Sequence, residues 1–141
     1  MFIESFNPTG HVIVRLNDDI VYDGPNLITT AGKALIASRM VDGNDSVVSH
    51  LAAGSNNTAA AAGDTALASE LGRVALTSFT HSTNTFTAVA TLAAGTATGA
   101  VVEFGLLNAS SSGTLLCRTV VSTINKGSSD SITVTWVLTA S

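Results

Sequence analysis

Charged side chains are scarce in this chain. Of its 141 residues, 11% are Asp, Glu, Lys or Arg, against about 25% in typical soluble domains. The six Lys and Arg residues are scattered and the formal net charge is −4, so the sequence offers no basic patch for the phosphate backbone of a nucleic acid. We therefore expect no nucleic-acid partner.

Signals for membranes, secretion and disulfides are also missing. No apolar run approaches the roughly 18 residues that a membrane-spanning helix needs, so we expect no membrane partner. Residues 1–6 lack the basic region and the long apolar stretch of a secretory signal. Cys117 is the single cysteine and cannot form an internal disulfide. These absences predict synthesis and folding in a reducing cytoplasm.

Motifs for catalysis are absent as well. His11, His50 and His81 share no local spacing that would bind a metal ion. The sequence contains no nucleophile elbow, no glycine-rich phosphate loop and no paired-carboxylate motif. We interpret Cys117 as a small buried apolar residue rather than an activated thiol. We expect no enzymatic activity, no cofactor, and no catalytic, metal-binding or cofactor-binding residue.

What the sequence does contain is a succession of short strand patterns. Alternating apolar and polar residues predict a hairpin over residues 11–22 and further strands between residues 47 and 140. Helical spacing of apolar residues predicts one main helix over about residues 30–41, after a capping threonine. The sequence predicts a mainly β chain: an antiparallel, jelly-roll-like β-sandwich with one main α-helix.

We expect an extended N-terminal arm over residues 1–10 and a single β-sandwich domain over residues 11–141. Within the domain, residues 64–72 contain a capping residue and a terminal glycine, which predict a short helical turn. Residues 73–80 and 85–92 are threonine-rich runs on either side of a turn, and we expect each run to form one strand of a hairpin.

The final strand pattern, over residues 131–140, places apolar residues at every second position. Trp136 falls on the apolar face of this strand, so we expect it to be a core anchor. The alternative is that Trp136 stacks against a bound sugar, as exposed aromatic residues do in some β-sandwiches.

Four charged residues stand beside apolar strands or turns: Glu70, Arg73, Glu103 and Arg118. We expect at least one Glu–Arg pair among them to be partly buried and to fix the short helical segment against the sheet. The alternative is that all four lie in solvent at the rim of the domain.

Outward positions of the predicted strands are mostly Thr, Ser and Ala. Charged residues normally prevent the edges of sheets from pairing, so this composition predicts that the subunit assembles with copies of itself or with partners. Phe2, Ile3 and Phe6 are the candidate anchors by which the arm contacts a neighbour, adding a strand to an exposed edge. The alternative is that these three residues complete the subunit's own core.

Three stretches, taken in order, resemble a known group of proteins. They are residues 26–33 (NLITTAGK); residues 51–55 (LAAGS) leading into residues 63–73 (GDTALASELGR); and residues 103–108 (EFGLLN), followed by residues 113–118 (GTLLCR) and the Trp136 strand. Over roughly residues 26–139 the chain resembles small structural proteins of tailed bacteriophages, which are described as capsid decoration (cement) proteins or as tail and tail-fibre components.

This resemblance implies a non-enzymatic, oligomeric β-sandwich of the virion. We expect a capsid decoration protein, made in the cytoplasm of the bacterial host, that lies on the outer capsid surface. Its expected partners are the major capsid protein and copies of itself in a homotrimer, and its expected role is to stabilise the mature head. A tail or tail-fibre-attachment subunit of the same fold remains an alternative, as does a sugar-binding adhesin module.

Overall fold

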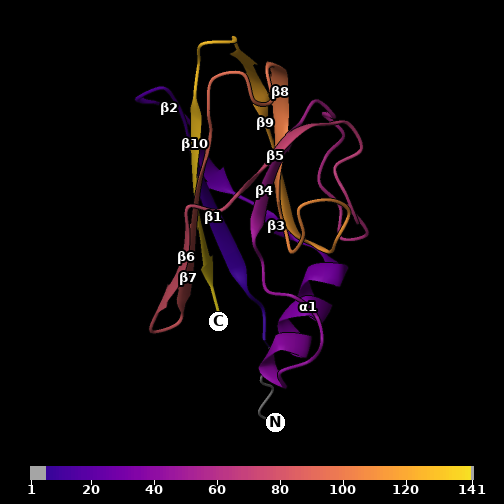
Figure 1. The fold of residues 1–141 in the computed structure, drawn as a ribbon. Helices are drawn as coiled ribbons and strands as arrows, with labels where there is room; N and C mark the ends of the chain where they lie inside the picture. The colour runs from indigo at the N-terminus through magenta and orange to yellow at the C-terminus, as the bar shows by residue number, and fades with distance from the viewer. Residues whose placement is uncertain (1–5, 141) are drawn as a thin grey trace.

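In the part of the chain that the structure describes, two five-stranded antiparallel sheets pack face to face, and a single helix lies at one end of the pair (Figure 1). The computed structural model describes residues 6–140 of the chain. In the first sheet the strand order is β2-β1-β10-β7-β6, and in the second it is β3-β9-β8-β4-β5. The predicted mainly β fold, an antiparallel sandwich with one main helix, is confirmed.

The elements follow one another along the chain with short connections in most places. The first sheet consists of β1 (Thr9–Leu16), β2 (Asp19–Pro25), β6 (Ser78–Ser82), β7 (Thr85–Leu92) and β10 (Ile132–Thr139). The second sheet consists of β3 (Leu27–Ile28), β4 (His50–Gly54), β5 (Glu70–Ala75), β8 (Gly99–Leu107) and β9 (Leu115–Lys126). The helix, α1 (Thr30–Met40), follows β3.

One face of strand β10 is buried between the two sheets. Its residues alternate between buried and partly exposed, because side chains of a strand point alternately to the two faces of its sheet. Trp136 has no exposed surface and belongs to the core between the sheets, as the sequence predicts. Strand β10 lies between β1 and β7, so the first sheet joins residues from both halves of the chain.

Helix α1 begins where Thr29 caps it. The Thr29 hydroxyl accepts a hydrogen bond from the Gly32 amide at 2.9 Å and donates one to the Leu115 carbonyl at 2.8 Å, so the cap also attaches the helix to β9. A Cβ atom on Gly32 would lie 2.0 Å from the Leu116 carbonyl oxygen. Glycine at this position therefore lets the first turn of the helix contact the backbone of β9 directly.

Two of the predicted elements are wrong in detail. Residues 64–69 form an irregular loop that ends in a turn at residues 68–69, not a helical turn, and β5 begins at Glu70. Residues 73–80 do not form one strand: β5 belongs to the second sheet and β6 to the first. The chain crosses between the sheets at Leu76 and Thr77, whose amides donate to Ser49 on one side and to Val89 on the other.

Candidate functional site

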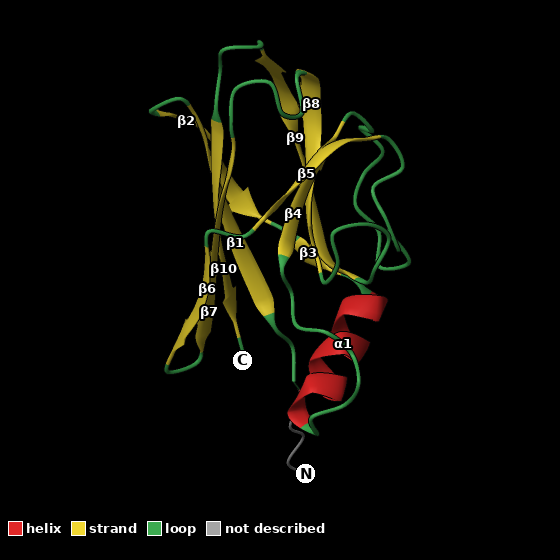
Figure 2. Cartoon of the chain, in the orientation of Figure 1, coloured by secondary structure: helices red, strands yellow, loops and turns green. Residues whose placement is uncertain are grey.

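Large exposed apolar side chains gather at the end of the sandwich that carries α1. Figure 2 shows the β6–β7 hairpin and the helix extending from this same end. Between them lies an open groove of about 290 Å³, which we call the apolar groove. Its lining is Phe6, Pro8, Ile28, Leu35, Ile36, Arg39, Met40, Val47, Val48, Phe79, Phe86, Leu116, Leu138 and Thr139.

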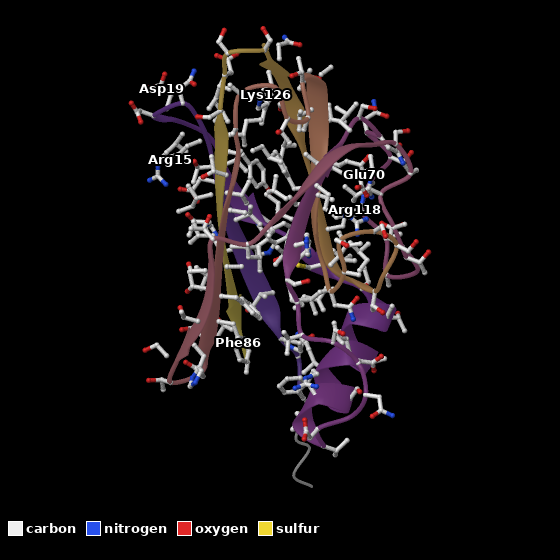
Figure 3. The ribbon with its side chains drawn as sticks, in the orientation of Figure 1. Arg15, Asp19, Glu70, Phe86, Arg118 and Lys126 are labelled. Carbon is white, nitrogen blue, oxygen red and sulfur yellow. The ribbon has the colours of Figure 1, made fainter. Side chains whose placement is uncertain are left out.

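The rim of the apolar groove faces solvent. Met40 is 77% exposed, and Phe6 is 56% exposed. Phe86, labelled in Figure 3, belongs to β7 of the hairpin and is also partly exposed. Among residues 6–140, Arg39 is the one charged residue in the lining, and its guanidinium donates to the carbonyls of Gly43 and Asp45 in the loop after the helix. The groove therefore offers a binding partner apolar contacts and almost no charge.

The edge strand β6 borders this groove. All five of its residues are exposed, and none of them is Asp, Glu, Lys or Arg. The other edges are protected: β2 carries two aspartates and ends in a proline, β5 carries Glu70 and Arg73, and β3 has only two residues. Charge, proline and shortness are the usual protections of an edge strand, so β6 is the edge most open to an added strand.

The outer face of the first sheet carries no charged side chain along the neighbouring strands β7 and β10. Cross-strand neighbours there include Thr133 with Thr91, whose hydroxyls lie 3.1 Å apart. The outward residues of these two strands are Thr85, Thr87, Val89, Thr91, Thr133, Thr135, Val137 and Thr139. The prediction that outward positions are mainly small hydroxyl and apolar residues is confirmed for β7 and β10.

A buried arginine organises the long loop between β4 and β5. Arg118 Nε donates to Glu103 Oε1 at 3.0 Å, and Arg118 Nη1 donates to Asp64 Oδ2 at 2.9 Å. Its Nη2 reaches the carbonyls of Asn56 and Thr58 at 3.2 and 2.9 Å. Glu103 has no exposed surface, and its second carboxylate oxygen accepts from the Asn56 amide at 2.7 Å.

A second pair lies nearer the surface. Arg73 donates to both carboxylate oxygens of Glu70, at 3.0 and 2.7 Å. Its Nη1 also donates to the carbonyls of Ala109 and Ser112, both at 2.9 Å. Arg73 therefore attaches β5 to the turn between β8 and β9. Figure 3 labels Glu70 and Arg118, which lie on the same side of the molecule.

The structure thus brings the four charged residues together as two pairs, Glu103 with Arg118 and Glu70 with Arg73. The expectation that a Glu–Arg pair fixes a short helical segment against the sheet was wrong in one respect. No helical segment is present at residues 64–69, and Arg118 instead binds the loop between β4 and β5. Sequence reasoning also missed Asp64 as a partner of Arg118. Its only sequence signal was that of a capping residue, and the two lie 54 positions apart.

The other candidate residues are placed as follows. Phe2 and Ile3 lie outside the described residues, whereas Phe6 lies at the groove. Trp136 is fully buried, so its ring cannot stack against a sugar in this fold. Cys117 is also buried, and loss of hydration raises the pKa of its thiol well above the usual value.

The titratable side chains of residues 6–140 do not converge on a cluster suited to metal binding. His11 is hydrogen-bonded to Asp23 on the neighbouring strand, His50 contacts the Ser49 hydroxyl at 2.7 Å, and His81 is exposed on β6. Within the same residues, no group of three or more His, Cys, Asp or Glu side chains could hold a metal ion, and no helix is long and apolar enough to cross a membrane.

Two surface features therefore define the candidate site: the apolar groove and the adjoining edge of β6. Both are suited to binding another polypeptide, because one offers apolar contacts and the other offers backbone hydrogen bonds. Comparison with known proteins adds no assignment, since no protein-family model, no curated protein and no solved structure matches the chain.

Proposed function

We propose that this chain is a structural subunit of a tailed-bacteriophage virion, a capsid decoration protein. In this proposal it forms a homotrimer, lies on the outer surface of the head and binds the major capsid protein. The observation that carries the proposal is the apolar groove at one end of a molecule with few charged side chains. Exposed apolar surface of this kind marks a contact with another protein, and the resemblance in sequence to phage structural proteins supplies the kind of partner.

The role follows from differential binding. A protein that binds the mature lattice and not its precursor stabilises the mature state by the difference between the two binding free energies. Three subunits that hold one lattice through separate weak contacts also gain avidity without a tight single contact. No catalytic group is needed for this role.

Two measurements on purified phage test the proposal. The first is copy number: on a stained gel, a decoration protein should approach the molar abundance of the major capsid protein. A few copies per particle would instead indicate the tail or tail-fibre subunit, and absence from virions would refute both roles.

The second measurement is the temperature at which heated heads release their DNA. Heads that lack the protein should release their DNA at a lower temperature than complete heads, and equal release temperatures would refute stabilisation.

A matched pair of variants locates the contact. Met40→Glu places a carboxylate at the rim of the apolar groove and should weaken binding to heads that lack the protein. Ile20→Glu is the control, because Ile20 is also a large exposed apolar residue (53%) but lies on β2, outside the lining of the groove. Equal binding by both variants would show that the groove does not contact the head.

A further inference from the structure

The edge strand β6 has a sequence that is complementary to itself. Within residues 6–140 no strand pairs with its outer edge, and the strand reads Ser-Phe-Thr-His-Ser from Ser78 to Ser82. When two such strands lie antiparallel with Thr80 at the centre, each serine lies opposite a serine and threonine lies opposite threonine. The remaining two positions place Phe79 opposite His81. Hydroxyl groups therefore meet hydroxyl groups, and aromatic rings meet aromatic rings.

The free backbone groups of this edge belong to Phe79 and His81. In β7 the Val89 carbonyl accepts a hydrogen bond from the Thr77 amide at 2.7 Å, so the backbone of Val89 is directed toward β6. Bonding direction alternates along an antiparallel strand, so every second residue of β6, beginning with Ser78 opposite Val89, bonds to β7. The amides and carbonyls of the two residues between them point away from β7 and are available to another strand.

We propose that β6 binds β6 of a second copy of this chain, antiparallel, across a two-fold axis beside Thr80. The two five-stranded first sheets then become one continuous sheet. Phe79 of each copy lies directly opposite His81 of the other, and each such pair exchanges both of its backbone hydrogen bonds. This register uses the whole length of β6 and satisfies all the backbone groups that the edge leaves free.

The outer side chains of β6 fit this contact. Ser78, Thr80 and Ser82 are exposed and lie on the same face of the sheet as the threonines of β7 and β10. The hydroxyls of Thr91 and Thr133 lie 3.1 Å apart across those two strands, which shows the contact that opposed hydroxyl residues make on this face. Neither β6 nor β7 carries Asp, Glu, Lys or Arg, so two copies can approach along this edge without bringing like charges together.

The inner side chains of the edge would also be covered. Phe79 pairs with the buried Ala88 across the hairpin, so its side chain lies on the inner face of the sheet, where it is 38% exposed. His81 lies on the same face, two residues along the strand. The ring of His81 from the second copy would therefore cover Phe79, and removing this apolar surface from water favours the association.

This contact goes beyond the proposed function. A two-fold contact joins copies in pairs, so it does not form the proposed homotrimer; it would connect one trimer to the next. It concerns the isolated protein and does not depend on a capsid.

Cysteine cross-linking of the full chain tests the contact directly. Beside the two-fold axis the two Thr80 residues lie opposite each other with Cβ atoms about 4.5–5.5 Å apart, close enough for a disulfide after mild oxidation. We expect the single variant Thr80→Cys to form a reducible dimer on a denaturing gel. The native Cys117 is buried and its thiol pKa is raised, so it does not compete.

The matched control is Ser78→Cys, which lies on the same strand, on the same face, and is also exposed. In the proposed register Ser78 lies opposite Ser82 of the second copy, so two thiols at position 78 lie roughly 13 Å apart along the strands. The control should cross-link weakly, and the double variant Ser78→Cys, Ser82→Cys should restore the dimer. Cross-linking of Thr80→Cys no stronger than that of Ser78→Cys would overturn the proposal.

Sedimentation equilibrium gives an independent measurement. Thr80→Lys places two ammonium groups together at the axis and should weaken the pairing by at least about tenfold. Thr91→Lys is the control, because Thr91 is exposed on β7 beyond the end of β6, and it should associate like the original protein. Equal molar masses for the original protein and Thr80→Lys across a dilution series would refute the pairing. None of these measurements involves a virion, so a failure here is distinct from a failure of the proposed function.

Discussion

Replacing Arg118 with methionine is expected to cost about 3–5 kcal/mol of unfolding free energy, the range for breaking a buried ion pair by removing one partner. The substitution leaves the Glu103 carboxylate in the interior with a single hydrogen bond, from the Asn56 amide. It also removes the donors to the Asn56 and Thr58 carbonyls and to Asp64. The long loop between β4 and β5 would then lose its main attachment to the second sheet.

Arg73→Met is the matched control. Its partner Glu70 has a side chain that is 31% exposed, so the carboxylate remains hydrated when the arginine is lost. We expect a smaller cost of about 1–2 kcal/mol, mainly from the two hydrogen bonds to the Ala109 and Ser112 carbonyls.

Urea denaturation followed by Trp136 fluorescence measures both costs, because the indole passes from the core to water on unfolding. The double variant Glu103→Leu, Arg118→Met removes both charges, and it should be clearly more stable than Arg118→Met alone. If Arg118→Met unfolds within about 1 kcal/mol of the original protein, or no more easily than Arg73→Met, the reasoning from burial is refuted.

Three further outcomes are expected. The Cys117 thiol should stay unreactive toward a disulfide reagent at pH 8 in the folded protein and react fully in denaturant, because burial raises its pKa; rapid reaction without denaturant would contradict this. The Asn17 side chain lowers the pKa of Asp130 below 3.8, so the stabilisation from this carboxylate is present above that value and is lost as the pH falls through the folded pKa. In melting experiments, the difference between the original protein and Asp130→Asn should therefore shrink in acid; a constant difference would argue against it. Gly32→Ala should lower the melting temperature, since its Cβ would lie 2.0 Å from the Leu116 carbonyl oxygen; an unchanged value would mean that the helix can move at no cost.

Local patterns predicted the elements whose structure depends on near neighbours. The alternation in β10 gave the buried face and Trp136, and the threonine before α1 gave the start of the helix to within a residue or two. The division of residues 73–80 between two sheets could not be predicted this way. The residues of β5 and β6 do not show to which sheet each strand belongs. The crossing depends on the carbonyl acceptors of Ser49 and Val89, which are distant in sequence.

The candidate site was predicted only in part. The sequence singled out Glu103 and Arg118 because charges stand out among apolar residues, but it could not show that Asp64 completes the cluster. The apolar groove was not visible at all, since Phe6, Met40, Val47 and Phe79 come from separate segments and meet only in the folded chain. Phe6 alone was expected to contact a neighbour, whereas Met40, Val47 and Phe79 each resemble ordinary core residues in the sequence.

The position of β10 between β1 and β7 has a consequence for biosynthesis. Leu16 pairs with Ile132, so the first hairpin emerges from the ribosome long before its neighbour in the sheet has been translated. Until then one side of β1 and one side of β7 have no partner, and unpaired edges of this kind invite aggregation during folding. Expression yield should therefore depend on chaperones that shield the nascent chain, even though the finished sandwich protects those same edges.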